Sequence, residues 1–498
     1  MRNFIGLVLL CLGARAAAQP AADAPPPVQR EFRGVWLVTV GNGDWPSRPG
    51  LSTWEQQREL LGMLNKAAEL HMNAIVFHIR PGADAIYDSP YEPWAIYLTG
   101  RQGRAPEPYW DPLKFAVEES HRRGMELHAW FNPYRAHYTK DTATAATNHI
   151  VRTNPELVHP YGRFVWMDPG EPEVRRRSLR AITDVVKRYD IDGVHIDDYF
   201  YPYPEQDSLK HTVEFPDSAT YARYVKHGGA LSRSDWRRKN VDDFIHSFYV
   251  EVHKLKAWVK VGISPFGIWR PGNPPTIKGF DAYEQIAADS KKWFQEGWAD
   301  YLTPQLYWAM DPPDQSYPVL LKWWTQQNVK NRHLWVGNYA GRVGMTGTRA
   351  WKSDEIARQI AATRAQAGAT GNVHFPMNVF MKDPDSLDTR IAEAYAEPAL
   401  VPASPWLGAK APATPAATLT TDRITGDHII SLNTTSTRPW LWVVRTRGAT
   451  GWVTAIVPGS EKIHRLLGSD AQSDVAWVST VSRTGVESRV VMARYAPR

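Results

Sequence analysis

Cysteine is almost absent from this sequence. Cys11 is the only one among 498 residues, and it lies in the apolar part of an N-terminal segment that we interpret as a secretory signal, residues 1–18. Once that segment is removed, the chain has no thiol. The sequence therefore excludes disulfide bonds, thiolate metal sites and a cysteine nucleophile from the mature protein.

Long apolar runs and a strong charge of one sign are also missing. After residue 18 no run approaches the ~18 apolar residues that a membrane helix needs, so no transmembrane segment is expected. The 58 basic and 52 acidic residues leave a net charge of only +6, spread along the chain, so a nucleic-acid partner is not expected. No GxGxxG follows the first predicted strand, which argues against a dinucleotide cofactor.

The signal segment predicts export. Arg2 precedes an apolar run at residues 5–12, and three alanines at 16–18 provide small residues for cleavage. A periplasmic or secreted protein is expected, with no cofactor, and we expect a monomer. A lipoprotein anchored through Cys11 is the weaker alternative, because Leu10 rather than a small residue precedes that cysteine.

Aromatic residues, in contrast, are abundant. The chain has 22 tryptophans and 21 tyrosines. Many must belong to the core, but aromatic faces at this density favour stacking on flat ligands such as sugar rings.

Short apolar strands alternate with amphipathic helices over most of the chain. This alternation is typical of parallel βα units. After a linker at 19–29, the region 30–398 contains eight such units, which predicts an α/β fold, a (β/α)₈ TIM-like barrel. The predicted strands are 32–40, 73–80, 125–132, 193–197, 259–264, 300–305, 333–337 and 371–375. The predicted helices are 52–70, 111–123, 172–189, 241–258, 290–297, 318–329, 353–367 and 384–395.

The loops that follow the predicted strands are long, and those that enter them are short. Long loops rich in Trp, Tyr, Pro and Gly on one rim predict a deep cleft at the C-terminal face of the barrel, a shape suited to a polymer substrate.

The stretch 190–201 carries the most specific chemical signal. Side chains alternate along a strand, so His195 and Asp197 face away from Val194 and Ile196. Polar residues on an interior face at a strand's carboxyl end are expected to be functional in a barrel. Asp197 is therefore the first catalytic candidate. Asp198 is the second, provided that the chain bends after the strand.

The same alternation places Arg80 and Asn132 at the tips of strands two and three. His78 and His128 lie deeper, where a hydrogen-bonded interior layer could account for them. With Arg135, the two tip residues could hold hydroxyl, acetamido or carboxylate groups by charge-assisted bonds.

A second, separate carboxylate is not evident. Glycoside hydrolysis normally uses two carboxyl groups, one on each side of the scissile bond. Strands five to eight end without an obvious Glu, so the second acid would have to come from a loop or from an Asp–Asp arrangement. The remaining acids expected on the rim are Asp44, Asp84, Asp168, Glu171, Glu284 and Asp289.

The C-terminal part changes character. Residues 399–418 form a Pro/Ala/Thr-rich linker, and residues 419–498 contain short strand-like runs without a helical pattern. We predict a small all-β sandwich of fibronectin or immunoglobulin type. Its tryptophans could form a sugar-binding face or a core.

Six motifs in order resemble a bacterial glycosyl-hydrolase-like family, also described as family-10-glycosidase-like. They are the runs at 32–40 with Asp44-Trp45-Pro46, 128–135, 168–175, 193–200, 264–270 and 301–308, and together they span roughly 30–397. The resemblance implies a peptidoglycan glycosidase of the cell wall that acts in cell division and prefers glycan strands without peptides. The substrate-binding candidates are Asp44, Trp45, Arg80, Trp130, Asn132, Arg135, His195, Tyr199, Trp269, Gln305, Tyr307 and Trp308.

Three alternatives remain open from the residues. One is a metal-dependent polysaccharide deacetylase that uses His195, Asp197 and Asp198, although such sites normally need more imidazoles. Another is a non-catalytic glycan-binding envelope protein. The last is a glycosidase of a different polysaccharide.

Overall fold

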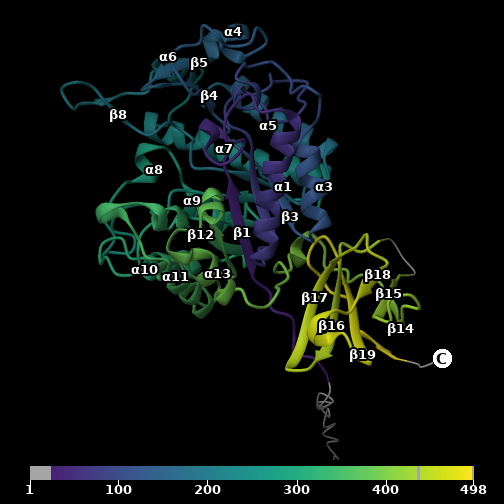
Figure 1. The fold of residues 1–498 in the computed structure, drawn as a ribbon. Helices are drawn as coiled ribbons and strands as arrows, with labels where there is room; N and C mark the ends of the chain where they lie inside the picture. The colour runs from purple at the N-terminus through teal and green to yellow at the C-terminus, as the bar shows by residue number, and fades with distance from the viewer. Residues whose placement is uncertain (1–23, 435–437, 496–498) are drawn as a thin grey trace, which may run out of the picture.

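Eight parallel strands close into a barrel, as predicted (Figure 1). The computed structural model describes residues 24–434 and 438–495, so the predicted signal segment and the first part of the first linker lie outside the described residues. The strand order is β1-β13-β12-β11-β10-β7-β3-β2. The barrel strands are β1 Phe32–Leu37, β2 Ala74–Arg80, β3 Glu126–Phe131, β7 Gly193–Ile196, β10 Lys260–Ile263, β11 Tyr301–Leu302, β12 His333–Asn338 and β13 Gly371–His374.

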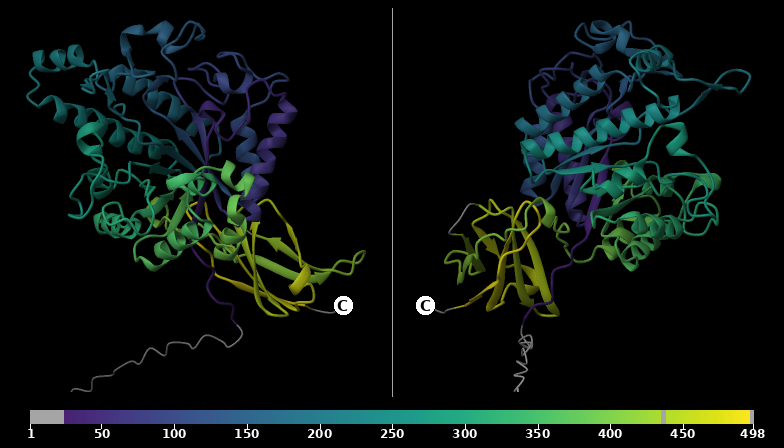
Figure 2. Two further views of the ribbon diagram at one scale, coloured as in Figure 1. Left: turned by 60° about the vertical axis from the view of Figure 1, so that its left-hand side comes forward. Right: turned by 180° about the vertical axis from the view of Figure 1, so that it is seen from behind.

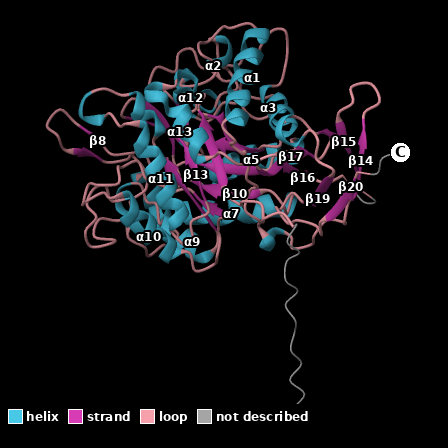
Figure 3. Ribbon diagram, turned by 60° about the horizontal axis from the view of Figure 1, so that its bottom comes forward, coloured by secondary structure: helices cyan, strands magenta, loops and turns pink. Residues whose placement is uncertain are grey.

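Helices surround the strands (Figure 3). The longer ones are α1 Thr53–Glu69, α3 Pro112–Arg122, α5 Pro172–Arg188, α7 Arg233–Leu255, α9 Ser290–Glu296, α10 Tyr317–Gln327, α11 Ser353–Ala365 and α13 Leu387–Ala394. Helix α1 begins where expected, because Ser52 and Glu55 form a reciprocal capping box. Helix α7 begins at Arg233, eight residues before the predicted start at 241. The prediction missed its first two turns because they are polar and carry no apolar periodicity.

Strand alternation divides the core into two layers. Val194 and Ile196 pack outward with the helices, whereas Trp36, Val76 and Trp130 belong to a separate cluster inside the barrel. This agrees with the period of two that the sequence predicted.

Arg80 departs from that pattern. The register between β2 and β3 shifts between His78 and Arg80, so His78 pairs with Trp130 while Arg80 pairs with Phe131, an outward-facing residue. An extra residue in a strand moves the next side chain to the opposite face. The interior position predicted for Arg80 is therefore wrong, because the register shift between His78 and Arg80 turns its side chain outward.

The insertions after β3 and β7 build the upper rim in Figure 1. They contain a small three-stranded sheet, a two-stranded hairpin and two helices. These elements are β4 Arg135–His137, β5 Val158–Tyr161, β6 Phe164–Met167, β8 Glu205–Gln206, β9 Thr212–Val213, α4 Ile150–Thr153 and α6 Ser218–Lys226. Shorter helices in other loops are α2 Ile96–Thr99, α8 Ala282–Gln285 and α12 Asn378–Lys382.

The C-terminal region is a β-sandwich. One sheet has the order β14-β15-β18 and the other β17-β16-β19-β20, and side chains of both sheets share one apolar cluster. The strands are β14 Ala416–Thr421, β15 His428–Asn433, β16 Leu441–Gly448, β17 Gly451–Pro458, β18 Ile463–Arg465, β19 Val475–Val481 and β20 Val491–Arg494.

The sandwich lies at the end of the barrel opposite the long insertions, in both views of Figure 2. Arg30 donates to the Gly485 carbonyl at 2.7 Å and pairs with Glu487 at 3.2 Å. Leu400 packs with Leu441 of the sandwich. The residues between the two domains are therefore not a free linker.

The connecting segment itself also contacts the barrel. Trp406 donates from Nε1 to Asp300 Oδ1 at 2.8 Å, and the Ser404 hydroxyl lies 2.9 Å from His333 Nε2. Within residues 24–434 and 438–495, no helix combines the length and apolar character needed to cross a membrane.

Candidate active site

A cavity of about 340 Å³ opens at the carboxyl ends of the barrel strands. Its walls are mostly aromatic, which suits a sugar ring. Eight of the predicted site residues line it, and they come from the ends of β3, β7 and β11 and the loops that follow: Trp130, Arg135, His195, Asp197, Asp198, Tyr199, Gln305 and Tyr307.

Asp197 lies just after β7 and is held by neutral donors. Trp130 Nε1 donates to its Oδ2 at 3.0 Å, Asn132 Nδ2 lies 3.3 Å from both oxygens, and the Tyr199 amide donates to Oδ1 at 3.4 Å. The side chain is only 3% exposed. Burial raises the pKa of Asp197 to about 7, because the nearby Arg135 only partly offsets the loss of hydration. The group can therefore hold a proton at neutral pH.

Asp198 lines the same cavity, because the chain bends directly after the strand. The Tyr203 hydroxyl donates to Asp198 Oδ2. Burial raises the pKa of Asp198 as well, although hydrogen bonds from Tyr203 and Gln305 oppose that change. The bend that the sequence required for Asp198 to face the cavity is present, and two acidic groups meet at one wall.

Arg135 covers one side of the cavity as a flat cation. Its guanidinium lies 4.5 Å from the centre of the Tyr199 ring and donates from Nη1 to the Pro81 carbonyl at 3.1 Å. Its Nε is buried without a hydrogen-bond partner among the described residues. Asn132 lies behind it, accepting the Arg135 amide at 2.8 Å while it donates to Asp197.

His195 belongs to a hydrogen-bonded column inside the barrel. Trp36 Nε1 can only donate, and it donates to His195 Nε2 at 3.2 Å. His195 Nδ1 therefore carries the hydrogen and donates to the Tyr301 hydroxyl at 3.1 Å, which in turn donates to His128 Nδ1 at 2.7 Å. His128 Nε2 then donates to Glu126 at 2.9 Å. The column fixes the neutral tautomer of His195 and orients Trp36 at the cavity.

His78 is a polar residue without an assigned partner. It stacks on Trp130 with ring centres 3.9 Å apart, it lines the cavity, and neither ring nitrogen has a hydrogen-bond partner among the described residues. Burial lowers the pKa of His78 far below its usual range, so the ring is neutral. A neutral imidazole here is available to a ligand hydroxyl.

The remaining predicted binding residues do not line the cavity. Asp44 accepts the Val38 and Asn378 amides at 2.7 and 2.9 Å, and Trp45 is fully buried with Nε1 on the Gln56 carbonyl. Arg80 pairs with Glu92 at 2.6 Å on the outer side of its strand.

Trp269 and Trp308 lie beyond the cavity wall. Trp269 donates to Asp289 Oδ1 at 3.0 Å and stacks on Trp323. Trp308 packs edge-on against Phe266, which does line the cavity.

The other acids considered for the second carboxylate are engaged elsewhere. Asp84 accepts from Gln102 at 2.8 Å, and Asp168 accepts from Thr220 at 2.6 Å. Glu171 pairs with Arg223, and Glu284 with Arg238 at 3.0 Å. Among the described residues that line the cavity, Asp197 and Asp198 are the only carboxylic acids.

Sequence reasoning missed several aromatic residues of the cavity wall. Tyr339 and Phe375 directly follow β12 and β13, and Tyr203 follows β7. A signal was present for two of them, since Phe375 ends the predicted strand 371–375 and Tyr339 lies two residues after the predicted strand 333–337.

The donor set does not resemble a metal centre. Within the described parts of the chain, no group of three or more His, Cys, Asp and Glu is arranged to hold a metal ion. Both ring nitrogens of His195 are already engaged by Trp36 and Tyr301, so this residue offers no free nitrogen to a metal ion of the kind a deacetylase would use.

A model of the family described as glycosyl hydrolase-like 10 matches residues 31–353. Glycosyl hydrolase YngK of Bacillus subtilis is 41% identical over 412 residues, which cover 80% of this chain and 78% of that protein. Glycosyl hydrolase DigH of Escherichia coli is 34% identical over 352 residues, which cover 65% of this chain and 77% of that protein.

Solved structures with a similar arrangement are more distant in sequence. The PgaB glycoside hydrolase domain from Bordetella bronchiseptica is 13% identical with a TM-score of 0.48, covering 73% of this chain and 98% of that one. The catalytic domain of β-amylase from Paenibacillus polymyxa is 12% identical with a TM-score of 0.48, and the match covers 74% of this chain and 98% of that one.

Proposed function

The chain belongs to the glycosyl hydrolase-like 10 family, and from that premise we propose that it cleaves the glycan strands of peptidoglycan, preferring strands without peptides. Asp197 and Asp198 supply the carboxyl chemistry in this proposal. The protein is exported by its N-terminal segment and acts in the cell envelope, in the periplasm or outside the cell.

One observation carries the catalytic part of the proposal. Two buried acids with raised pKa values meet at the wall of an aromatic-lined cavity on the C-terminal rim of the barrel. Perturbed carboxyl groups in a cleft are typical of acid–base catalysis, and this rim is where barrel enzymes carry their active sites.

The cavity walls also support a polysaccharide as the substrate. Arg135, Tyr199 and Tyr307 offer a cation and two rings to a bound sugar. The preference for strands without peptides follows from the family resemblance, and a narrow aromatic cavity is compatible with it, because a bulky peptide on the sugar would have to clear these walls.

The test is digestion of purified sacculi by the chain without residues 1–18. Peptide-free and peptide-bearing sacculi are incubated with the protein, and the products are identified by mass spectrometry. New reducing ends from the peptide-free substrate, at a rate well above the peptide-bearing one, are expected.

Three other outcomes would contradict the proposal. Release of acetate without chain cleavage would indicate a deacetylase. Retention of the protein on sacculi with no product from either substrate would indicate a glycan-binding protein, and cleavage of only another polysaccharide would reassign the substrate.

A further inference from the structure

The two acids of the cavity are arranged unusually for a pair that flanks a scissile bond. They are neighbours in sequence, and both lie in the segment directly after β7. In most glycosidases the two catalytic carboxyl groups lie on opposite sides of the sugar, about 5 Å or more from each other. Here no other described residue that lines the cavity is a carboxylic acid, so no carboxyl group is available on the opposite side of a bound sugar.

A hydrolase with acids on one wall needs its nucleophile from somewhere else. We propose that the nucleophile is the 2-acetamido group of the substrate, so that the site is selective for glycans of 2-acetamido sugars and cleaves next to them with retention of configuration. This inference rests on the proposed function and goes further, because it names the reacting group of the substrate and separates the roles of the two acids.

Asp197 is suited to orient the acetamido group. Its carboxylate is fixed by Trp130, Asn132 and the Tyr199 amide, so it cannot rotate away. An ionised carboxylate in this position accepts the acetamido N–H, which turns the acetamido oxygen toward C1 and increases its electron density.

Asp198 is suited to donate the proton. It is the other acid of the wall, and it accepts hydrogen bonds from the side chains of Tyr203 and Gln305 and from its own backbone amide. Burial raises the pKa of both acids, so each can carry a proton in the free protein. A substrate N–H that donates to Asp197 stabilises its ionised form, so the proton then resides on Asp198.

Tyr307 is available to hold the acetamido oxygen. Its ring lines the cavity, and its hydroxyl has no hydrogen bond to any described residue. A hydroxyl that donates to this oxygen would position it without competing for the N–H.

The chemistry balances without a cofactor. In the first step the acetamido oxygen bonds to C1, the bond from C1 to the leaving oxygen breaks, and the Asp198 proton moves to that oxygen. The N–H proton is shared with Asp197, and an oxazolinium ring results. In the second step water attacks C1, its proton returns to Asp198, and the C1–oxygen bond of the ring breaks, which restores the acetamido group.

The first experiment uses peptide-free glycan strands that are intact, chemically de-N-acetylated, or re-N-acetylated with acetyl or trifluoroacetyl groups. De-N-acetylation should reduce kcat by about a thousandfold or more, because an intramolecular nucleophile is lost. Acetyl groups should restore it. Trifluoroacetyl groups, similar in size but poorer donors of electron density, should restore KM but not kcat. Equal rates on all four substrates would overturn the inference while leaving the proposed function intact.

The second experiment separates the two acids by leaving group. On an aryl glycoside of a 2-acetamido oligosaccharide, whose phenolate needs no proton, Asp198→Asn should retain turnover within about tenfold of the unaltered protein, whereas Asp197→Asn should lose about a hundredfold or more. Equal losses in both variants would contradict the division of roles.

A binding measurement gives a result that does not depend on turnover. A thiazoline fused to the sugar imitates the bicyclic intermediate and should bind at least about 100-fold more tightly than the corresponding 2-amino sugar. Absence of a difference in affinity overturns the inference. Absence of hydrolysis on every glycan, together with tight thiazoline binding, would instead contradict the choice of peptidoglycan as substrate.

Discussion

Asp192 and Asp197 stand at the two ends of the same strand, β7, and both are 3% exposed. Their pKa values nevertheless move in opposite directions. Burial alone would raise the pKa of Asp192, but Arg483 and His121 lower it below its ordinary value. Burial raises the pKa of Asp197 to about 7, since its hydrogen-bond donors are neutral. Equal burial therefore gives a stable ion at one end and a proton-holding acid at the other.

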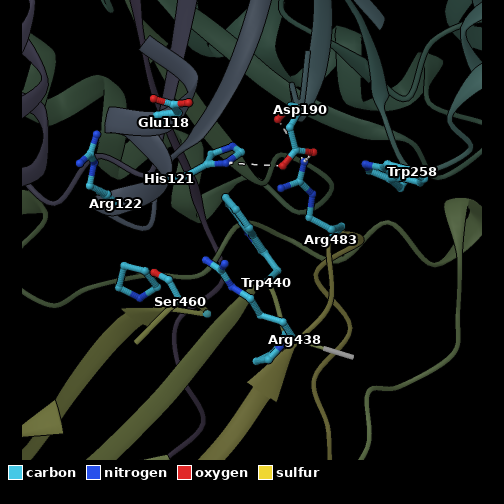
Figure 4. A pocket seen from close by; sticks show the side chains of 12 residues that line it. Glu118, His121, Arg122, Asp190, Trp258, Arg438, Trp440, Ser460 and Arg483 are labelled. Atoms are coloured by element: carbon cyan, nitrogen blue, oxygen red, sulfur yellow. Dashed lines mark hydrogen bonds and ion pairs between the residues drawn. The ribbon is translucent and has the colours of Figure 1, made fainter. Parts of the chain in front are cut away.

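The difference extends to the two rims of the barrel. At the N-terminal rim charged groups meet partners: His121 lies 2.9 Å from Asp192, and Arg483 of the sandwich lies 2.7 Å from Asp190. Figure 4 shows His121, Asp190 and Arg483 around the interdomain cleft, where Trp440 packs against both His121 and Arg483. At the C-terminal rim His78 and Arg135 Nε keep unpartnered atoms. Unpaired polar atoms that line a cavity are available to hydrogen-bond a ligand.

The substitution Asp197→Asn should have the largest effect. Turnover on peptide-free glycan should fall by about a thousandfold, because a carboxylate that takes part in proton transfer or orientation is lost. Stability should not fall. Because burial raises the pKa of Asp197 to about 7, this residue contributes its full stability only at pH values below the pKa of an unfolded aspartate. The contribution is lost as the pH rises through 7, where the buried group ionises. Melting curves at pH 5 and pH 8, with turnover, check both parts; a variant at near wild-type rate would remove Asp197 from the mechanism.

Removal of residues 416–498 should strongly destabilise the barrel and leave its chemistry intact. Arg30, Asp190 and Asp192 lose partners, and Leu400 loses its apolar cover. We expect Tm to fall by about 5 °C or more, with turnover per folded molecule unchanged because the cavity lies on the other rim. An unchanged Tm would show that the interface contributes little, as the linker composition had suggested.

Asp192→Asn is the matched control for Asp197→Asn, since the two residues are equally buried at opposite ends of β7. It should cost about 3 kcal/mol of stability, because Arg483 and His121 lose a buried charge, and it should not change kcat. Because the pKa of Asp192 is lowered in the folded protein, its contribution to stability is fully present at pH values above the pKa of an unfolded aspartate. The contribution is lost as the pH falls through the pKa of the folded state. Denaturant unfolding at pH 7 and pH 3 measures it. A loss of kcat in correctly folded Asp192→Asn would mean that the two rims are coupled.

The smallest effect concerns pH. Because one proton must remain on the acid pair, and burial raises the pKa of both Asp197 and Asp198, kcat/KM should stay high up to about pH 7 and fall about tenfold per unit above it. A profile from pH 5 to 9 on peptide-free glycan checks this. A fall that begins near pH 4, as for an exposed aspartate, would contradict the raised pKa values.

Local pattern predicted much of the molecule. The eight strands and their helices follow from periodicity, because side-chain alternation and amphipathicity reflect the backbone geometry of each element. The position of Asp197 on the interior face needed nothing beyond this rule. The same rule misplaced Arg80, since a strand irregularity between His78 and Arg80 has no marker in the residues themselves.

By itself, then, the sequence determined the barrel, the sandwich and the strand end that carries Asp197 and Asp198. Only the tertiary structure decided which acids share a cavity, which tryptophans are core, and how each carboxyl group titrates. The reason is physical: alternation depends on neighbours in the chain, whereas burial and charge pairing depend on groups such as Arg483 and Trp130, which folding brings to Asp192 and Asp197 from distant positions in the sequence.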